Sequence, residues 1–257
     1  MASNNDSIIK TFVVVGALCL VCSILVAGAA VGLRPWQDAA KARDRQANIL
    51  SVAGLPLQDV ARTYHSRIEA RLLDLQTGQY VAGDANRYDM KKASRDPALS
   101  VVIPAELDKA GLKRRAKLMP VYLAKDAQGQ VESLILPIYG QGLWSTMYGF
   151  VSLAPDGNTV KGITYYDHGE TPGLGSEIEN PRWQALWIGK LLYGEQGDVA
   201  LKIIKGHAPE GDPHRIDGLS GATLTSNGVQ HTFDYWMGPN GYGPFLATLR
   251  NGGQNHG

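Results

Sequence analysis

The sequence predicts an α+β protein, in which a single N-terminal transmembrane helix precedes a domain built on an antiparallel sheet with flanking helices. Three observations predict this class. A long uncharged apolar run lies near the N-terminus, two successive pairs of β-branched and aromatic segments lie in the middle, and amphipathic helical patterns follow them. This order of elements is typical of α+β packing and differs from the strict alternation of a doubly wound parallel sheet.

Composition limits the functions to be considered. The chain has 257 residues, of which 44% are hydrophobic and 19% charged, as in folded proteins rather than disordered ones. The formal net charge of +1 argues against a nucleic-acid partner, which usually requires a strongly basic surface. The predicted organisation is an N-terminal tail (1–10), a transmembrane helix (11–33), a helical and charged connecting region (34–117) and a main domain (118–257).

The apolar run from Thr11 to Leu33 contains no charged side chain. It exceeds the ~20 residues that cross a bilayer core as a helix. It is also longer than the ~7–15-residue core of a signal peptide, although Ala27-Gly28-Ala29 resembles a cleavage site. We therefore expect a retained anchor. Cys19 and Cys22 lie inside the run, where packing is favoured over metal or dithiol chemistry.

The connecting region begins with apolar residues at helical spacing from Trp36 to Ala53, and Gly54 and Pro56 end this pattern. Two charge-rich stretches follow, at 84–96 and 106–117. We expect them to be solvated helix faces and loops, with a docking patch for a partner protein as the alternative.

Strand signals begin at Leu118. Segments 118–124 and 131–138 flank the turn Asp126-Ala127-Gln128-Gly129, and segments 148–153 and 159–166 flank Pro155-Asp156-Gly157-Asn158. Two successive hairpins predict an antiparallel sheet.

Three more elements are expected after the hairpins. Asn180-Pro181 is typical of a helix cap and first turn, with the helix running to about Leu192. A strand is expected at 199–205. A second helix is expected from Asn227 to Met237, with Val229, Phe233 and Trp236 on its buried face.

The run Asp217-Gly218-Leu219-Ser220-Gly221-Ala222-Thr223-Leu224-Thr225-Ser226 combines flexible backbone with several hydroxyls. Its two glycines permit unusual backbone angles, and its small side chains let a bulky group approach the main chain. These properties favour a phosphate site. The run is neither a P-loop, which needs a Lys before its Ser/Thr, nor the three-glycine dinucleotide fingerprint.

Residues Asp217 to Thr223 resemble the flavinylation motif of FMN-binding domains, in which an Asp-Gly-x-Ser/Thr-Gly-Ala-Thr segment carries FMN through a phosphoester to its last Thr. With the runs 142–145 and 170–175, the chain resembles, over essentially its whole length, the family of the C subunit of the sodium-translocating NADH:quinone oxidoreductase. The resemblance implies a membrane-anchored flavoprotein whose covalent FMN relays single electrons between redox centres, coupled to sodium translocation by the complex.

The resemblance also assigns residues. Thr223 would be the covalent acceptor, although Thr225 offers a second hydroxyl. Asp217 would be recognised by the modifying enzyme; the alternative is that it only forms a turn. For Trp144 the alternative to a ring contact is core packing. The remaining expected FMN-binding residues are Ser220, Gly221, Ala222, Leu224 and Thr225 near the phosphate, and Trp144, Glu170, Thr171, Gly173 and Leu174 near the ring.

Other chemistries have weaker support in the sequence. His207 and His214 lack the spacing and acidic companion of a catalytic zinc site, so no metal ligands are expected. A Ser or Thr nucleophile has no accompanying base motif, so no catalytic residue is expected. Two alternatives stay open: the homologous subunit of the ferredoxin-oxidising Rnf complex, and a periplasmic binding module without redox turnover.

Charge and resemblance disagree on orientation. Lys10 precedes the apolar run, whereas Arg34, Lys41, Arg43 and Arg45 follow it, which by the positive-inside rule places the large domain in the cytoplasm. The resemblance implies a bacterial inner-membrane protein whose flavin domain faces the periplasm, where a flavin transferase attaches the cofactor. We adopt the periplasmic expectation, with other subunits of a redox complex as partners.

Overall fold

The computed structural model describes residues 8–252, which form two compact units separated between Arg45 and Gln46. The first helix, α1 (Ile8–Val52), is continuous through Pro35, so the two helical segments expected before Gly54 form one helix. The helix also includes residues 8–10 of the expected tail, and residues 1–7 lie outside the described part. From Lys10, α1 contains a stretch long and apolar enough to cross a membrane, with exposed side chains.

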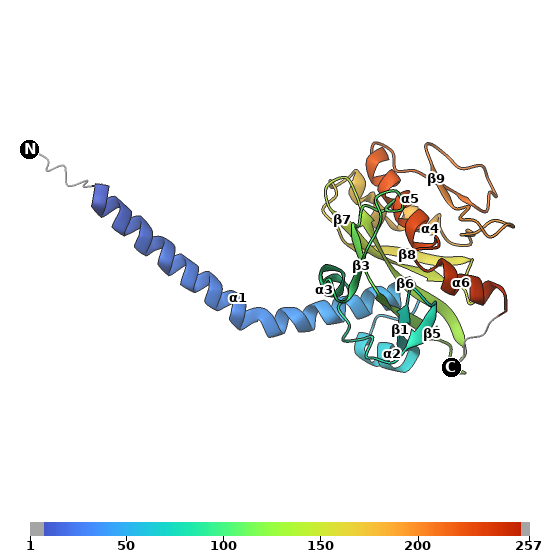
Figure 1. The fold of residues 1–257 in the computed structure, drawn as a ribbon, viewed down its shortest axis with the longest axis horizontal. Helices are drawn as coiled ribbons and strands as arrows, with labels where there is room; N and C mark the ends of the chain where they lie inside the picture. The colour runs from blue at the N-terminus through green and yellow to red at the C-terminus, as the bar shows by residue number, and fades with distance from the viewer. Residues whose placement is uncertain (1–7, 253–257) are drawn as a thin grey trace, which may run out of the picture. The chain divides into compact units, whose positions relative to one another are not determined.

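A six-stranded sheet organises the second unit, with strand order β2-β1-β5-β6-β7-β8 and every neighbouring pair antiparallel (Figure 1). The two hairpins expected from the sequence are present as β5/β6 and β7/β8. The strands are β1 (Ile68–Asp74), β2 (Gln79–Val81), β5 (Leu118–Lys125), β6 (Val131–Gln141), β7 (Thr146–Leu153) and β8 (Val160–Asp167).

Strands β1 and β2 lie within residues 34–117, the expected helical and charged connecting region, which is therefore only partly helical. Glu69 and Arg71 in β1 contact each other at 2.5 Å, and Glu69 pairs with Lys125 of neighbouring β5 at 2.5 Å. Glu69 and Arg71 alternate with Ile68, Ala70 and Leu72, so this charged pair lies on one side of the strand. The same region holds α2 (Val60–Arg67), α3 (Met90–Arg95) and a separate ribbon of β3 (Ser100–Val102) and β4 (Arg114–Ala116).

The sheet has a core on each face, because side chains alternate along its strands. In β5, Met119, Val121 and Leu123 belong to the larger core, whereas Tyr122 and Ala124 belong to the smaller one. The C-terminal helices α5 (Thr223–Trp236) and α6 (Gly243–Arg250) contribute to the larger core. The end of α1 and α2 contribute to the smaller core.

Helix α5 has the expected buried face of Val229, Phe233 and Trp236, but it begins four residues before the expected Asn227. The Trp236 indole Nε1 donates to the Tyr139 carbonyl of β6 at 2.7 Å. Helix α5 is therefore fixed against the sheet by a buried hydrogen bond as well as by apolar contact.

The helix expected from Pro181 to Leu192 is shorter. Asn180 caps it as expected, accepting from the Arg182 amide at 2.9 Å, but α4 ends at Ala185. Gly189 then adopts φ +82° and donates its N–H to Val160 at the sheet edge, so the chain has left the helix.

The expected strand 199–205 is reduced to β9 (Lys202–Ile204), which pairs in parallel with β10 (Arg215–Asp217) outside the main sheet. A short 3₁₀ turn, η1 (Gly175–Glu179), precedes α4.

Candidate functional site

The glycine-rich motif connects β10 to α5. Asp217 is the last residue of β10, and Thr223 is the first of α5. Between them Gly221 has φ +75°, a backbone conformation that favours glycine. The motif is therefore a tight strand-to-helix connection, and the helix expected to begin beyond the phosphate site begins within the motif itself.

The N-terminus of α5 has unused hydrogen-bond donors. Ala222 is its N-cap residue and makes no side-chain capping bond, and the first helical bond runs from Ser226 N–H to the Ala222 carbonyl at 3.0 Å. The N–H groups of Thr223, Leu224 and Thr225 therefore have no helical acceptor. Together with the helix dipole they favour an anion at this end.

The two threonines of the motif have opposite environments. Thr223 is exposed. Thr225 is only 2% exposed, and its Oγ1 donates to Glu170 Oε2 at 2.6 Å. The hydroxyl of Thr225 is thus occupied inside the protein, whereas that of Thr223 faces solvent.

Glu170 joins α5 to the turn between β6 and β7. Its carboxylate is buried and accepts from the Trp144 amide at 2.9 Å and the Leu143 amide at 3.2 Å, in addition to Thr225. Burial by itself would raise the pKa of the Glu170 carboxyl, but the hydrogen bonds from Thr225 and the backbone amides outweigh it and lower the pKa. Glu170 therefore stays ionised and accepts hydrogen bonds from three groups, the Leu143 amide, the Trp144 amide and the Thr225 hydroxyl.

Close packing around Glu170 requires glycine at two neighbouring positions. A Cβ added at Gly142 would lie 2.6 Å from Glu170 Oε1, and one added at Gly175 would lie 2.5 Å from Thr225 Oγ1. Both distances are too short for a side chain. These glycines allow the 142–145 turn and the 170–175 loop to meet beside α5.

Exposed apolar side chains surround this junction. The Trp144 indole is 68% exposed, and its Nε1 donates to Thr171 Oγ1 at 3.0 Å, so the alternative of a core tryptophan is wrong. Leu174 lies next to Gly221, whose added Cβ would be 3.2 Å from Leu174 Cδ2. Leu143, Leu174 and Leu224 are 44%, 44% and 59% exposed. Clustered exposed apolar groups are typical of a binding surface.

The rest of the 170–175 loop is held by backbone turns. Gly173 has φ +74° and donates its N–H to Ser176 Oγ at 3.0 Å. Ser176 donates its own N–H to the Thr171 carbonyl at 3.1 Å. Thr171 and Leu174 are thus presented from a closed loop.

Asp217 does not point its carboxylate at the helix end. Its Oδ1 accepts from the Ala208 amide at 2.7 Å, and its Oδ2 lies 2.7 Å from His207 Nδ1. The Ala208 N–H lowers the pKa of Asp217, and His207 contributes further. Trp183 Nε1 donates to the Asp217 carbonyl at 2.9 Å. The sequence did not predict the contacts of Asp217 with His207 and Trp183, which lie 10 and 34 positions away along the chain.

Within residues 8–252, no group of three or more His, Cys, Asp or Glu side chains has the arrangement of a metal site. The exposed groups near Thr223 are hydroxyls, backbone amides and apolar side chains. Such groups bind and orient a phosphate and an aromatic ring.

Comparison with known proteins identifies the same region. A family model for an FMN-binding domain matches residues 142–238, which include the 142–145 turn, the 170–175 loop and the motif.

Full-length relatives are also similar. The chain is 54% identical to the C subunit of the Na(+)-translocating NADH-quinone reductase of Yersinia pestis, covering 99% of this chain and 97% of that protein. It is 51% identical to the same protein of Neisseria meningitidis serogroup B, covering 97% of each chain. The crystal structure of Shewanella oneidensis NqrC superposes with a TM-score of 0.78 at 36% identity, covering 82% of this chain and 99% of that one. The chain therefore belongs to the family of C subunits of the Na(+)-translocating NADH-quinone reductases.

Proposed function

We propose that this protein carries FMN as a phosphoester on Thr223. The observation that carries the assignment is the contrast between the two threonines: Thr223 is exposed at the first position of α5, whereas Thr225 is buried and bound to Glu170. In the proposed attachment the Thr223 oxygen would form the bond to the FMN phosphorus and its hydroxyl would lose its proton, while the phosphoanhydride bond of an FAD donor breaks and AMP leaves. The Thr225 hydroxyl is not accessible for such a bond without breaking its contact with Glu170.

The end of α5 suits the phosphate. The unused N–H groups of residues 223–225 donate to its oxygens, and the exposed Ser220 offers a further hydroxyl. Gly221 and the small Ala222 let the phosphate approach the main chain. Asp217, whose carboxylate is turned toward His207 and Ala208, does not oppose the phosphate charge directly.

The exposed apolar groups beside Thr223 suit the isoalloxazine ring. Trp144, Leu174 and Leu224 offer apolar surface, and the Thr171 hydroxyl holds the Trp144 indole in place. Gly173 leaves open space on the loop, because an added Cβ there would meet no atom within 4 Å. Glu170 binds protein groups on three sides, so we assign it to positioning Trp144 and α5 rather than to contact with the ring.

The names of the relatives extend this assignment to the whole complex. Bound FMN supplies one-electron chemistry, and this chain holds it at an exposed edge where neighbouring redox centres can approach. Relay of single electrons within a sodium-pumping NADH:quinone oxidoreductase follows as the proposed role. The Rnf protein and the non-redox binding module are not favoured, because the full-length relatives reported above are all C subunits of the sodium pump.

We place the protein in the bacterial inner membrane through α1, with the flavin domain in the periplasm and Asp217 recognised there by a flavin transferase. The excess of basic residues after the apolar run opposes this orientation.

An impermeant thiol reagent, applied to spheroplasts, tests the orientation in a variant that carries a cysteine in place of exposed Lys109 and serine at positions 19 and 22. Labelling is expected, and labelling only after lysis would reverse the orientation.

The acceptor assignment predicts that Thr223→Ala abolishes covalent flavin, because the hydroxyl of Thr225, the other threonine of the motif, is buried and bound to Glu170. In-gel flavin fluorescence and intact mass, on protein produced with a flavin transferase, measure the result. The wild type is expected to gain the mass of one FMN less water.

Thr225→Val is the matched control. It removes the buried hydroxyl at similar side-chain size, and we expect it to retain covalent flavin with reduced stability. Full flavin on Thr223→Ala, or its loss only from Thr225→Val, would contradict the assignment of the bond to Thr223.

A further inference from the structure

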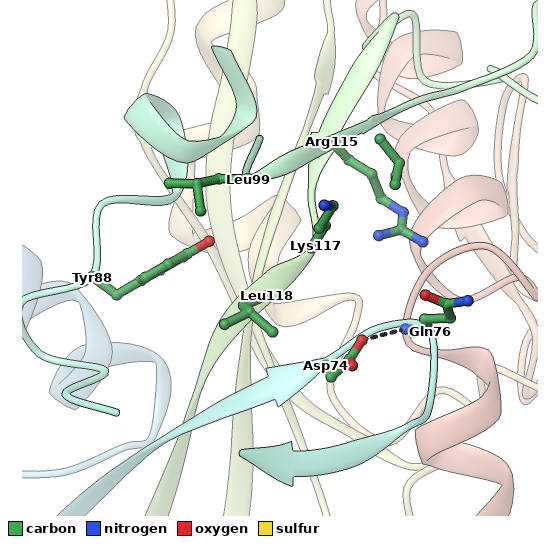
Figure 2. A pocket seen from close by; sticks show the side chains of 8 residues that line it. Asp74, Gln76, Tyr88, Leu99, Arg115, Lys117 and Leu118 are labelled. Atoms are coloured by element: carbon green, nitrogen blue, oxygen red, sulfur yellow. Dashed lines mark hydrogen bonds between the residues drawn. The ribbon is translucent and has the colours of Figure 1, made fainter. Parts of the chain in front are cut away.

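The β3–β4 ribbon places two cations on one side of a cavity. Val101 and Arg115 are opposite each other in the register, and the Lys117 N–H donates to the Leu99 carbonyl at 2.8 Å. Because side chains alternate along strands, Leu99, Val101, Arg115 and Lys117 share one side of the ribbon. They line a cavity of about 400 Å³, with Asp74, Gln76, Tyr88 and Leu118 as the other lining residues (Figure 2).

The two cations are bound to backbone carbonyls. Half-buried Arg115 donates to the Ala116 carbonyl at 3.1 Å, and Lys117 Nζ donates to the Ala98 carbonyl at 2.8 Å. Neither forms an ion pair with a carboxylate among residues 8–252. Like charges two residues apart on one strand face repel each other, and an incoming anion would relieve this repulsion.

The nearest acidic group in the cavity is already engaged. Asp74 Oδ1 accepts from the Gln76 amide at 2.8 Å, as the dashed line in Figure 2 shows. Asp74 carries the one negative charge among the lining residues, against the two positive charges of Arg115 and Lys117, so the lining keeps a net positive charge, and an acidic group would bind on the ribbon side.

Apolar groups lie beside these charges. Leu99 is 49% exposed, and Tyr88, Val101 and Leu118 are half-buried around the same cavity. An occupant that fits must carry a negative charge next to an apolar side chain. An acidic polypeptide segment with an apolar residue has this chemistry, and covering Leu99 would contribute to its binding.

We infer that this cavity binds a segment of another subunit of the same complex, in which an acidic residue lies next to an apolar residue. Membership in a multi-subunit reductase family supplies the class of partner. The site includes Arg115 and Lys117 at the end of the charge-rich stretch 106–117, and it also accounts for an exposed leucine that the flavin site leaves unexplained. The inference does not depend on which residue carries the covalent flavin.

The test compares two double charge reversals in the complete complex, purified from membranes through a tag on this protein. Arg115→Glu with Lys117→Glu reverses the cavity charges, and Lys92→Glu with Lys109→Glu makes the same charge change at exposed lysines outside the cavity. We expect the cavity variant to retain at least tenfold less of the other subunits at low salt, because truncating close charge pairs at an interface typically costs an order of magnitude or more. The difference should shrink as salt is raised and screens the charges. The control should assemble as the wild type does.

A milder variant separates docking from misfolding. Leu99→Ser with Lys117→Glu changes only exposed side chains, and covalent flavin fluorescence reports that the domain has folded. Reduced partner retention with normal flavin supports the docking site. Equal retention in all variants overturns it, as does normal assembly combined with a Tm that rises with octanoate in the wild type and not in the cavity variant, which would make the cavity a small-molecule site.

Discussion

The two faces of the six-stranded sheet differ in how they hold their helices. On the larger face, buried hydrogen bonds tie the helices to β6: Trp236 Nε1 at the end of α5 donates to the Tyr139 carbonyl at 2.7 Å, and the hydroxyl of Tyr242, which precedes α6, donates to the Pro137 carbonyl at 2.8 Å. On the smaller face, Ile49 and Leu50 at the end of α1 are fully buried by apolar contacts.

This difference matters because only the larger face carries the proposed flavin site. Hydrogen bonds are directional, so the Trp236 contact fixes the C-terminal end of α5 in register against β6, and the Tyr242 contact does the same for the start of α6. At the other end of the helix, Glu170 fixes Thr225 and hence the position of Thr223. The burial of Ile49 and Leu50 is an apolar contact, which is less directional.

The largest expected effect is that of Trp236→Ala. The indole is fully buried between Tyr139 and Tyr242, with ring centroids at 4.9 Å and 5.3 Å. Its removal leaves a cavity and an unpaired Tyr139 carbonyl, so we expect a loss of about 3–5 kcal/mol in the free energy of unfolding. Urea unfolding of the domain measures this loss. We also expect less covalent flavin on the protein that remains folded, because α5 is no longer held in register.

Leu50→Ala makes a comparable deletion on the smaller face, away from the proposed flavin site. It also removes a fully buried side chain, at a cost of about 2–5 kcal/mol, but it touches neither α5 nor its hydrogen bonds. Its folded fraction should therefore take up flavin as the wild type does. Equal flavin loss in both variants would show that stability alone governs attachment, and the contrast between the faces would fail.

The elements that the sequence predicted well are those with strong local patterns. The four strands from Leu118 to Asp167 and the buried face of α5 are periodic in the sequence and are confirmed. The start of α5 was misplaced because Thr223, Thr225 and Ser226 are weak helix formers. They are helical here partly because Ser226 Oγ accepts from the Leu219 amide at 3.0 Å, a contact that closes the motif on itself.

The candidate site shows where sequence reasoning reaches its limit. The motif and the two loops were recognisable, and the family resemblance pointed to Thr223 as the acceptor, but the residues by themselves also offered the Thr225 hydroxyl. The residue that distinguishes them, Glu170, lies 55 positions away along the chain. Likewise the contact between Asp217 and His207 depends on the path of the 205–214 loop, which has no periodic signal. Tertiary contacts of this kind cannot be read from spacing.

The smallest of the expected effects concerns Glu170, which connects the site to α5. In Glu170→Gln one carboxylate oxygen becomes an amide nitrogen, so one of the Leu143 and Trp144 amides loses its acceptor. An unsatisfied buried donor costs about 1–3 kcal/mol. We expect a loss of that size, with covalent flavin retained and its absorption spectrum shifted, because Trp144 is no longer fixed.

The stability difference between the wild type and Glu170→Gln depends on pH, in a direction set by the lowered pKa of Glu170. The pKa of Glu170 is lowered in the folded protein, so its stabilisation is fully present above the unfolded-state pKa of about 4.3 and is lost as the pH falls through the folded-state value. The stability difference between wild type and Glu170→Gln should therefore be constant near neutral pH and shrink in acid. Other carboxylates titrate equally in both proteins, so the difference isolates Glu170. A difference that stays constant through the acid range would mean that the Glu170 charge does not hold the site together, and the 142–145 turn would have to be positioned by packing.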